Sequence, residues 1–478
     1  MVYDVAIVGG GVVGALIAKE LSKYEINTVL LEKCNDVAQG TTKANSAIVH
    51  AGYDAIPGTL KAELNAEGSR VMCSLCIDLS VPYKNIGSLV VAFSDEEIKT
   101  LEELYERGRK NHIPQVEIIG AERLFELEPN INRDAVGALY APTAAIISPF
   151  ELCTAAVENA FTNGVDYIRN FEVAEIETDE NGDFVLKSDS SRVTAKYVIN
   201  AAGVFADKIA QMIGDDSMEI TPRKGEYFLF DKCVGTVVSH IIFQCPTEMG
   251  KGVLITPTVH ENLLIGPSAV DIEDKEDLST TSWGTNYVQS QVAKTLPDFA
   301  VRDVITTFAG LRARADSEDF IIQKSIKNNK FINVAGIDSP GLSAAPAIAK
   351  YVENILLSEM GELKKKEDYN PLRENPVRFN EMTRAQRKAI IEKDKAYGRI
   401  VCRCETVTEG EIIDAIHAPA GARDVDGVKR RTRAGMGRCQ GGFCGSKVVE
   451  ILARELNTSL DEITKFGGDS NYVIGKTK

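Results

Sequence analysis

The first 33 residues alternate between short apolar runs and small or polar residues. Residues 5–8 are apolar throughout, and a glycine-rich segment follows them. Apolar residues then recur at helical spacing as far as Leu21, and a second apolar run over residues 29–31 ends in Glu32. This pattern predicts a buried strand, a turn, an amphipathic helix and a second buried strand. The glycines of the turn are Gly9, Gly11 and Gly14.

These three glycines fit the pattern G-x-G-x-x-G. Gly9 permits a tight turn, Gly11 lets a pyrophosphate approach the backbone, and Gly14 lets the helix pack closely on the strand. The N-terminus of the helix offers N–H groups to phosphate. Glu32 lies 18 residues beyond Gly14, where an acidic side chain binds ribose hydroxyls. Taken alone, this stretch predicts a site for either NAD or FAD.

The patterns that follow predict an interrupted continuation of the same fold. Ser148 as N-cap, Pro149 as first helical residue and Glu151 as a capping partner mark one helix start. Residues 200–203 form a second small-residue turn at a strand end, so we expect the dinucleotide fold to resume there after an insertion. We expect helices over 59–77, 95–112, 121–128 and 149–162, and strands over 83–93, 165–168, 171–177, 184–187 and 193–198.

Residues 220–310 read as strand-rich and predict an antiparallel substrate platform. A later apolar run over 331–335 ends in Gly336, and a helix is expected over 344–358. A strand, a glycine turn and a helix at this point would return the chain to the first motif, which favours FAD over NAD. The polar residues inside the platform are Arg223, Lys224, Thr256, Thr258 and His260.

Composition narrows the class of protein. The chain has 478 residues, of which 44% are hydrophobic and 26% charged, as in soluble globular proteins. We find no run of 18 apolar residues and no basic segment before an apolar start, so we expect neither a transmembrane helix nor a signal peptide. A net charge of −15 argues against nucleic acid as a partner. We expect a cytoplasmic protein that associates with a membrane, if at all, through a partner.

Four of the ten cysteines cluster late in the chain. They form a C-x-C and a C-x₄-C pair, separated by 34 residues. Structural zinc sites usually use C-x-x-C pairs, whereas four thiolates among glycines suit a [2Fe–2S] cluster. Zinc and redox dithiols remain alternatives at this stage. The earlier C-x-x-C of Cys73 and Cys76 lies in an apolar helical pattern and is assigned to packing. The expected cluster ligands are Cys402, Cys404, Cys439 and Cys444.

The segment around these cysteines predicts a small helical domain. Thr408 and Glu411 form a capping box at the start of one helix. Basic residues flank the second cysteine pair, and we expect them to offset the negative charge of a tetrathiolate cluster rather than to bind nucleic acid. These basic residues are Lys429, Arg430, Arg431, Arg433 and Arg438.

Several of these stretches resemble known families. Residues 5–14, 45–52, 200–203 and 310–312 resemble the D-amino-acid-oxidase-like superfamily of FAD oxidoreductases, and within it the glycerol-3-phosphate dehydrogenases and L-2-hydroxyglutarate oxidases. Residues 401–445 resemble the bacterioferritin-associated-ferredoxin type of [2Fe–2S] domain, as found in bacterial anaerobic glycerol-3-phosphate dehydrogenases. Residues 340–345 lack the lysine that glycerol-3-phosphate dehydrogenases often carry there, and this departure is closer to the hydroxyglutarate pattern.

The resemblance implies an α/β fold with a Rossmann-like FAD-binding domain, an inserted antiparallel β substrate domain and a small helical [2Fe–2S] domain. We expect the FAD-binding domain in three parts (1–80, 146–215 and 311–360) and the substrate domain in two (81–145 and 216–310). A linker and helix (361–397), the cluster domain (398–456) and a tail (457–478) follow. The glycine-rich end of the tail is a candidate to pack back on the FAD domain.

The resemblance also assigns roles to residues. His50 is the candidate general base, with a bond to flavin or backbone as its alternative role. Arg312 is the candidate anchor for an anionic substrate, with a structural ion pair as its alternative. Tyr53 is a candidate to orient substrate, and Arg223, Lys224 and Arg314 are lesser candidates. The expected FAD contacts are Gly9, Gly11, Gly14, Glu32, Thr41, Thr42, Asn45, Ser46, Val173, Ala202, Gly203, Gly310, Gly336, Gly341, Leu342 and Ser343.

Three functions are compatible with these features. The first is oxidation of glycerol 3-phosphate to dihydroxyacetone phosphate, with electrons leaving through the cluster to a protein or quinone acceptor. The second keeps this chemistry but takes L-2-hydroxyglutarate or another 2-hydroxy acid. The third is a flavin and iron–sulfur electron-transfer subunit with no small substrate of its own. An oxidase needs no cluster, so the late cysteines favour a dehydrogenase with an acceptor protein or subunit.

Overall fold

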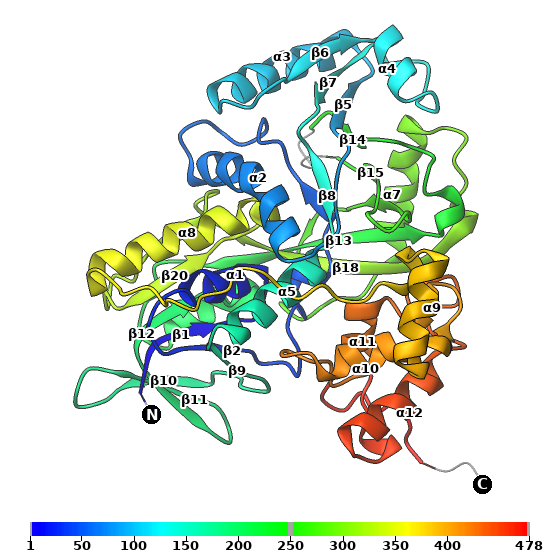
Figure 1. Ribbon diagram of the computed structural model, residues 1–478. Helices are drawn as coiled ribbons and strands as arrows, with labels where there is room; N and C mark the ends of the chain where they lie inside the picture. Colours follow the sequence, from blue (N-terminus) through cyan, green and yellow to red (C-terminus); the bar gives the residue numbers. More distant parts are fainter. Residues whose placement is uncertain (1, 247–251, 476–478) are drawn as a thin grey trace.

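The computed structural model describes residues 2–246 and 252–475 and has two large sheets (Figure 1). The first sheet has the order β10-β11-β12-β1-β2-β9, with β20 beside β12 and β19 beside β20. The pairs β12–β1, β1–β2, β2–β9 and β12–β20 are parallel. Its strands are β1 (Val2–Val8), β2 (Thr28–Leu31), β9 (Asp166–Ile168), β10 (Glu175–Thr178), β11 (Phe184–Lys187), β12 (Arg192–Asn200), β19 (Ile321–Lys324) and β20 (Phe331–Ala335).

Helices cover both faces of this sheet. On one face α1 packs between α5 and α8, and α2 packs on α8, as Figure 1 also shows. These helices bury Leu16, Leu152 and Ile348 in one apolar core with Ile7 and Leu30 of the strands. The shorter α6 packs near β12 and β20. The bounds are α1 (Val12–Leu21), α2 (Leu60–Asp78), α5 (Pro149–Thr162), α6 (Ala206–Gln211) and α8 (Gly341–Met360).

The second sheet forms the inserted domain, in the order β17-β13-β16-β15-β14-β5-β7-β6, with β18 beside β13. It is antiparallel except for the parallel pair β5–β14, which sequence periodicity did not reveal. Its strands are β5 (Ser88–Ala92), β6 (Glu117–Gly120), β7 (Gly137–Ala141), β13 (Ile220–Phe230), β14 (Ile241–Gln244), β15 (Leu254–Pro257), β16 (Leu263–Gly266), β17 (Val270–Asp271) and β18 (Val304–Ala315).

The inserted domain contains one helix that the strand-rich pattern of residues 220–310 did not predict. This helix, α7 (Ser282–Thr295), begins at Thr281, whose hydroxyl accepts a hydrogen bond from the Gly284 N–H at 2.9 Å. Its sequence buries only a few apolar residues, so its periodicity is weak. The predicted helices α3 (Asp95–Lys110) and α4 (Ala121–Leu127) are present. A small sheet of β3 (Ile48–Val49), β8 (Ala145–Ile147) and β4 (Tyr83–Asn85) completes this part.

The C-terminal part is a small helical unit (orange to red in Figure 1). Thr408 and Glu411 form the predicted capping box at the start of α10. The expected capping box at Ser148 is absent, because Ser148 makes no side-chain cap hydrogen bond. No helix in the described residues is long and apolar enough to cross a membrane. The elements are α9 (Arg384–Lys393), β21 (Ile400–Cys402), β22 (Val407–Thr408), α10 (Glu409–His417), α11 (Val425–Thr432) and α12 (Gly445–Leu456).

A buried ion cluster joins three parts of the chain. The carboxylate of Glu151 on α5 lies 2.9 Å from His260 Nε2 in the turn between β15 and β16, and 3.2 Å from Arg378 Nη2 in the linker. His260, expected on the substrate platform, therefore anchors one domain to another. Burial alone would raise the pKa of Glu151, but the hydrogen bond with His260, the charge of His260 when protonated and the charge of Arg378 outweigh it and hold the pKa at about 2. Burial lowers the pKa of His260 itself.

We expect Glu151→Gln to destabilise the protein at pH 7 by about 3 kcal/mol, because a carboxylate with a depressed pKa stabilises the fold. This contribution is complete above about pH 4.5 and disappears as the pH falls towards 2. Thermal unfolding between pH 7 and pH 3 measures the difference in free energy of unfolding between variant and wild type. This difference should become smaller below pH 4.5. Glu455→Gln, in the exposed pair with His417, is the control with little effect. A difference that stays constant with pH would contradict the assignment.

Candidate active site and cluster site

A cavity of about 990 Å³ runs between the two large sheets and carries most of the predicted cofactor residues. This volume is at the upper end of the range for ligand pockets. The predicted residues that line it are Gly9, Gly11, Glu32, Thr41, Thr42, Asn45, Ser46, Val173, Ala202, Gly203, Gly310, Gly341, Leu342 and Ser343.

One end of the cavity is built from the glycine motif. Gly9 has φ +112°, and a side chain there would lie 2.4 Å from the Ala201 carbonyl oxygen. Gly14 does not line the cavity; a Cβ there would lie 2.0 Å from the Gly9 carbonyl oxygen, so its role is close packing of α1 on β1. The N-terminal residues of α1, including Gly11 and Val12, line the cavity and present a helix N-terminus to it. This end therefore fits a pyrophosphate.

Glu32 fits the ribose-binding role at the same end. Its carboxylate accepts hydrogen bonds from the Gly10 N–H at 2.7 Å and the Cys34 N–H at 2.9 Å, which fix its position. Burial raises its pKa, and these two backbone bonds oppose that shift. Each carboxylate oxygen has a further lone pair, so Glu32 can still accept a bond from a ribose hydroxyl.

His50 lines the cavity directly after β3. Its backbone N–H donates to Ser343 Oγ at 2.8 Å, which ties it to the start of α8. The imidazole stacks on Phe243, with ring centroids 5.5 Å apart. Two separate parts of the chain thus hold His50 beside the cavity.

Arg312 also lines the cavity, on β18. Its cross-strand partner is Arg223, which lines the cavity too but is held by Asp271 at 2.6 and 2.8 Å. Arg314 is tied to the same carboxylate at 3.2 Å and does not line the cavity. Within residues 2–246 and 252–475 no carboxylate lies within 4 Å of the Arg312 guanidinium, so the structural ion pair considered as its alternative role is not formed there.

Three other predicted residues lie elsewhere. Tyr53, expected to orient substrate, is 5% exposed and packs in the core of the inserted domain, where burial raises its pKa. Gly336 does not line the cavity, although Val334 and Ile337 on either side do. Lys224 is buried and pairs with Asp277 at 2.7 Å.

The sequence did not identify several cavity residues. Lys61 on α2 pairs with Asp338 at 2.7 Å, and both line the cavity. Tyr227 on β13 lines it as well and stacks on Phe308, with ring centroids 4.9 Å apart. Lys61 and Tyr227 belong to ordinary helix and strand patterns, Asp338 follows β20, and only the tertiary fold brings them together at the cavity.

The four late cysteines meet as two pairs. The Sγ atoms of Cys404 and Cys439 lie 3.9 Å apart, and Cys402 and Cys444 share a side-chain hydrogen bond. No group of three or more His, Cys, Asp or Glu side chains in the described residues converges as a single-ion site. Two pairs of thiolates match a cluster in which each of two irons takes two sulfurs.

Backbone N–H groups also point at these sulfurs. The hydrogen bond from the Cys444 thiol, with the backbone N–H groups of Gly435 and Glu405, lowers the pKa of Cys402, while the pKa of the donor Cys444 is raised. Backbone N–H groups of Phe443 and Gly441 likewise lower the pKa of Cys439. Donors of this kind stabilise thiolates and tune Fe–S clusters, so the residues fit a [2Fe–2S] group.

Four of the five basic residues near the cysteines form ion pairs that mainly hold the domain in place, a role that the sequence did not predict. Arg430 and Arg431 both bind Asp36 of the first domain. Arg433 binds Glu405, and its Nη2 lies 3.2 Å from Asn262 Oδ1 of the inserted domain. The remaining contact is Arg438 with Asp231 at 3.0 Å.

Comparison with known protein families agrees with both cofactor sites. Residues 4–355 match the family model described as FAD dependent oxidoreductase. Residues 400–454 match the model described as BFD-like [2Fe-2S] binding domain.

Individual relatives show how far the similarity extends. The chain is 52% identical to glycerol 3-phosphate dehydrogenase of Caloramator mitchellensis, over 100% of this chain and 99% of the relative. It is 32% identical to L-2-hydroxyglutarate dehydrogenase of an Escherichia coli strain, over 56% of this chain and 64% of the relative. The solved L-alpha-glycerophosphate oxidase of Mycoplasma pneumoniae, with FAD bound, has a TM-score of 0.76 and 31% identity, and covers 79% of this chain and 100% of its own.

Proposed function

Because this chain belongs to the FAD dependent oxidoreductase family and carries a BFD-like [2Fe-2S] binding domain, we propose that it oxidises glycerol 3-phosphate to dihydroxyacetone phosphate. The observation that carries the proposal is the position of Arg312. Its guanidinium lines the cavity, and no carboxylate of the described residues lies within 4 Å of it. Gly310, two residues earlier, lines the same cavity. Full-length similarity to a glycerol 3-phosphate dehydrogenase supports this substrate.

Different residues of the chain have different roles in this reaction. When bound, FAD supplies the hydride acceptor, and the [2Fe–2S] group carries electrons onward one at a time. Glu32 and the N-terminus of α1 hold the dinucleotide end of the cofactor. Arg312 binds the substrate phosphate, which fixes the position of the alcohol. His50 takes the proton from the hydroxyl as the hydride leaves the adjacent carbon.

We expect Arg312→Ala to raise KM for glycerol 3-phosphate about 30-fold. Loss of a charge-assisted contact at a partly exposed site costs about 2 kcal/mol. Steady-state kinetics with an artificial acceptor measures the effect without involving the natural partner. Arg314→Ala is the matched control, because Arg314 lies outside the cavity. The KM of this variant should stay within twofold of the wild-type value. An unchanged KM in Arg312→Ala would remove this residue from the substrate site.

A 2-hydroxy acid remains a second candidate substrate, because residues 340–345 lack the lysine noted above and an arginine binds carboxylate as well as phosphate. The similarity to L-2-hydroxyglutarate dehydrogenase is lower and covers little more than half of the chain. Anaerobic mixing with each compound distinguishes the two: glycerol 3-phosphate should bleach the flavin absorbance and L-2-hydroxyglutarate should not. If neither compound bleaches it while an electron-donor protein does, the chain is an electron-transfer subunit.

We propose that the electrons leave through the cluster to an acceptor protein or subunit. Cys404 is exposed, and Phe443, between two of the cysteines, is 89% exposed. A redox partner can therefore approach the cluster closely from this side. The solved glycerophosphate oxidase matches 79% of this chain, so about a fifth of this chain has no counterpart in it. We place the enzyme in the cytoplasm, where free cysteines persist, or at a membrane through its partner.

A further inference from the structure

The loop of residues 34–38 lies between the glycine motif and the cluster domain. On one side, the Ala38 N–H donates to the Gly10 carbonyl oxygen at 3.0 Å, and Cys34 lines the cavity beside Glu32. On the other side, Asp36 is fully buried against α11 of the cluster domain. This loop therefore contributes Cys34 to the lining of the cavity and Asp36 to the contact with the cluster domain.

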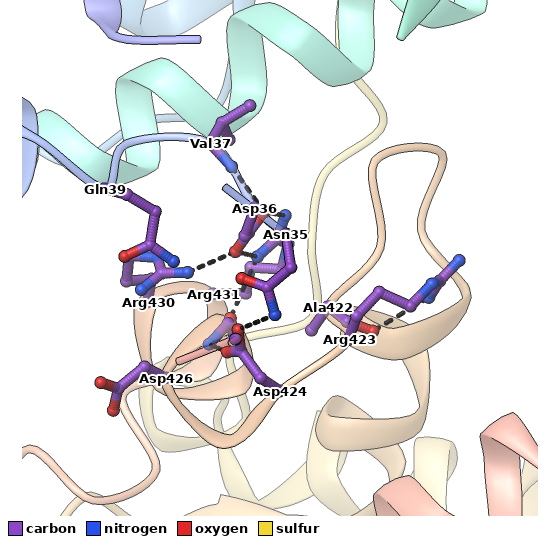
Figure 2. Close-up of polar contacts among 12 residues, drawn as sticks. Asn35, Asp36, Val37, Gln39, Ala422, Arg423, Asp424, Asp426, Arg430 and Arg431 are labelled. Carbon is purple, nitrogen blue, oxygen red and sulfur yellow. Dashed lines mark hydrogen bonds and ion pairs between the residues drawn. The ribbon is translucent and has the colours of Figure 1, made fainter. Parts of the chain in front are cut away.

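Asp36 is held by two arginines from the cluster domain (Figure 2). Its Oδ2 lies 2.5 Å from Arg430 Nη2 and 2.7 Å from Arg431 Nη1, and its Oδ1 lies 2.8 Å from Arg431 Nη2. Burial alone would raise the pKa of Asp36, but the two guanidinium groups hold it well below its usual range. A fully desolvated bidentate contact of this kind fixes the relative position of the two domains.

A second contact beside Asp36 seats the C-terminal segment. Asn35 Nδ2 donates to Asp424 Oδ2 at 2.5 Å, at the start of α11. Gly467 lies so close to Asn35 that a Cβ at this position would meet the amide group at 2.7 Å. The turn around Gly467 therefore rests directly on the loop that follows Glu32, in agreement with the expectation that the tail packs back on the FAD domain. Residues 476–478 of that tail lie outside the described residues.

This seating brings one aromatic side chain to the cofactor cavity. Phe466 lines the cavity, whereas every other described residue that lines it lies at or before Ser343. Phe466 is 54% exposed, so its ring is not used in a core. Because its neighbour Gly467 rests on Asn35, Phe466 lies at the end of the cavity formed by Lys33 and Cys34. This is the ribose end, where the adenine of FAD belongs.

We propose that the FAD site is completed by the C-terminal segment: Asp36 locks the cluster domain in place, and Phe466 then covers the adenine of FAD. An aromatic ring stacks favourably on a purine. FAD retention thus depends on how the cluster domain is seated against the first domain. The inference rests on FAD binding alone and is independent of the substrate proposed above.

The test is the dissociation constant of FAD, measured by fluorescence quenching on FAD-depleted full-length protein that keeps its iron. Phe466→Ala should raise the Kd about 5- to 100-fold, the range found for loss of one stacked base, and Phe466→Trp should restore it to within threefold of wild type. Asp36→Asn, which keeps the shape but removes the charge, should raise the Kd at least 10-fold. Ile474→Ala changes an exposed side chain of the same tail and is the matched control, with a Kd within twofold.

A Kd within twofold of wild type in Phe466→Ala would overturn the proposal, whatever Asp36→Asn does. Phe466 is a surface residue, so this variant remains informative if Asp36→Asn fails to fold. Iron content and the visible absorbance of the cluster must match wild type, which shows that a weaker FAD affinity does not follow from loss of the cluster. Because no substrate enters the measurement, its failure leaves the proposed reaction untouched.

Discussion

Replacing Cys439 by serine should abolish electron transfer to the acceptor while leaving reduction of the flavin by substrate intact. Cys439 is half-buried, its sulfur faces that of Cys404 at 3.9 Å, and backbone N–H groups favour its thiolate. Loss of one of four thiolate ligands removes the cluster or leaves it incomplete. We expect no EPR signal after reduction and a fall of at least 100-fold in acceptor-linked turnover.

Cys73→Ser is the matched control for this experiment, because Cys73 is an exposed free cysteine on α2, far in the sequence from the four late cysteines. It should keep the EPR signal and full turnover. Metal analysis of anaerobically prepared wild-type protein provides a second check. Tightly bound zinc with no iron, or an unchanged EPR signal in Cys439→Ser, would contradict the cluster assignment.

Replacing His50 by asparagine should lower kcat by 10²- to 10⁴-fold, the usual contribution of a positioned general base. Asparagine keeps the backbone bond to Ser343 and fills similar space, so FAD should stay bound.

Phe243→Leu is a useful companion to His50→Asn, because it removes the stacked ring but leaves the imidazole in place. Its kcat should fall by less than 10-fold, since the base itself remains. If His50→Asn changes kcat by less than threefold, then His50 only binds flavin or backbone, which is its alternative role.

Local patterns were enough to predict both cofactor sites. Gly14 packs on Gly9, and Glu32 binds the backbone of Gly10 and Cys34, so strand, turn and helix patterns within one short stretch identify them. The four cysteines likewise stand out by their C-x-C and C-x₄-C spacing, although the fold then pairs them across these two motifs. Family similarity confirms the FAD oxidoreductase and the [2Fe–2S] domain that these motifs indicated.

Contacts between distant segments could not be predicted. Tyr53 follows a functional loop in the sequence, but its side chain turns into the core of the inserted domain. Arg430 and Arg431 looked like counter-ions for the cluster because the sequence does not reveal that Asp36, almost 400 residues earlier, meets them. No sequence pattern indicated that Phe466 reaches the cofactor cavity, because a single aromatic residue in a polar tail is also typical of a solvent-exposed turn.

We propose that one chain passes electrons from glycerol 3-phosphate through a flavin to an iron–sulfur cluster. Anaerobic titration of the purified holoenzyme with glycerol 3-phosphate, followed by both flavin absorbance and EPR, is the decisive experiment. We expect the flavin band to bleach and the [2Fe–2S] EPR signal to appear in the same titration, with neither change after addition of L-2-hydroxyglutarate. Persistence of the oxidised flavin band at excess glycerol 3-phosphate would rule out this electron path.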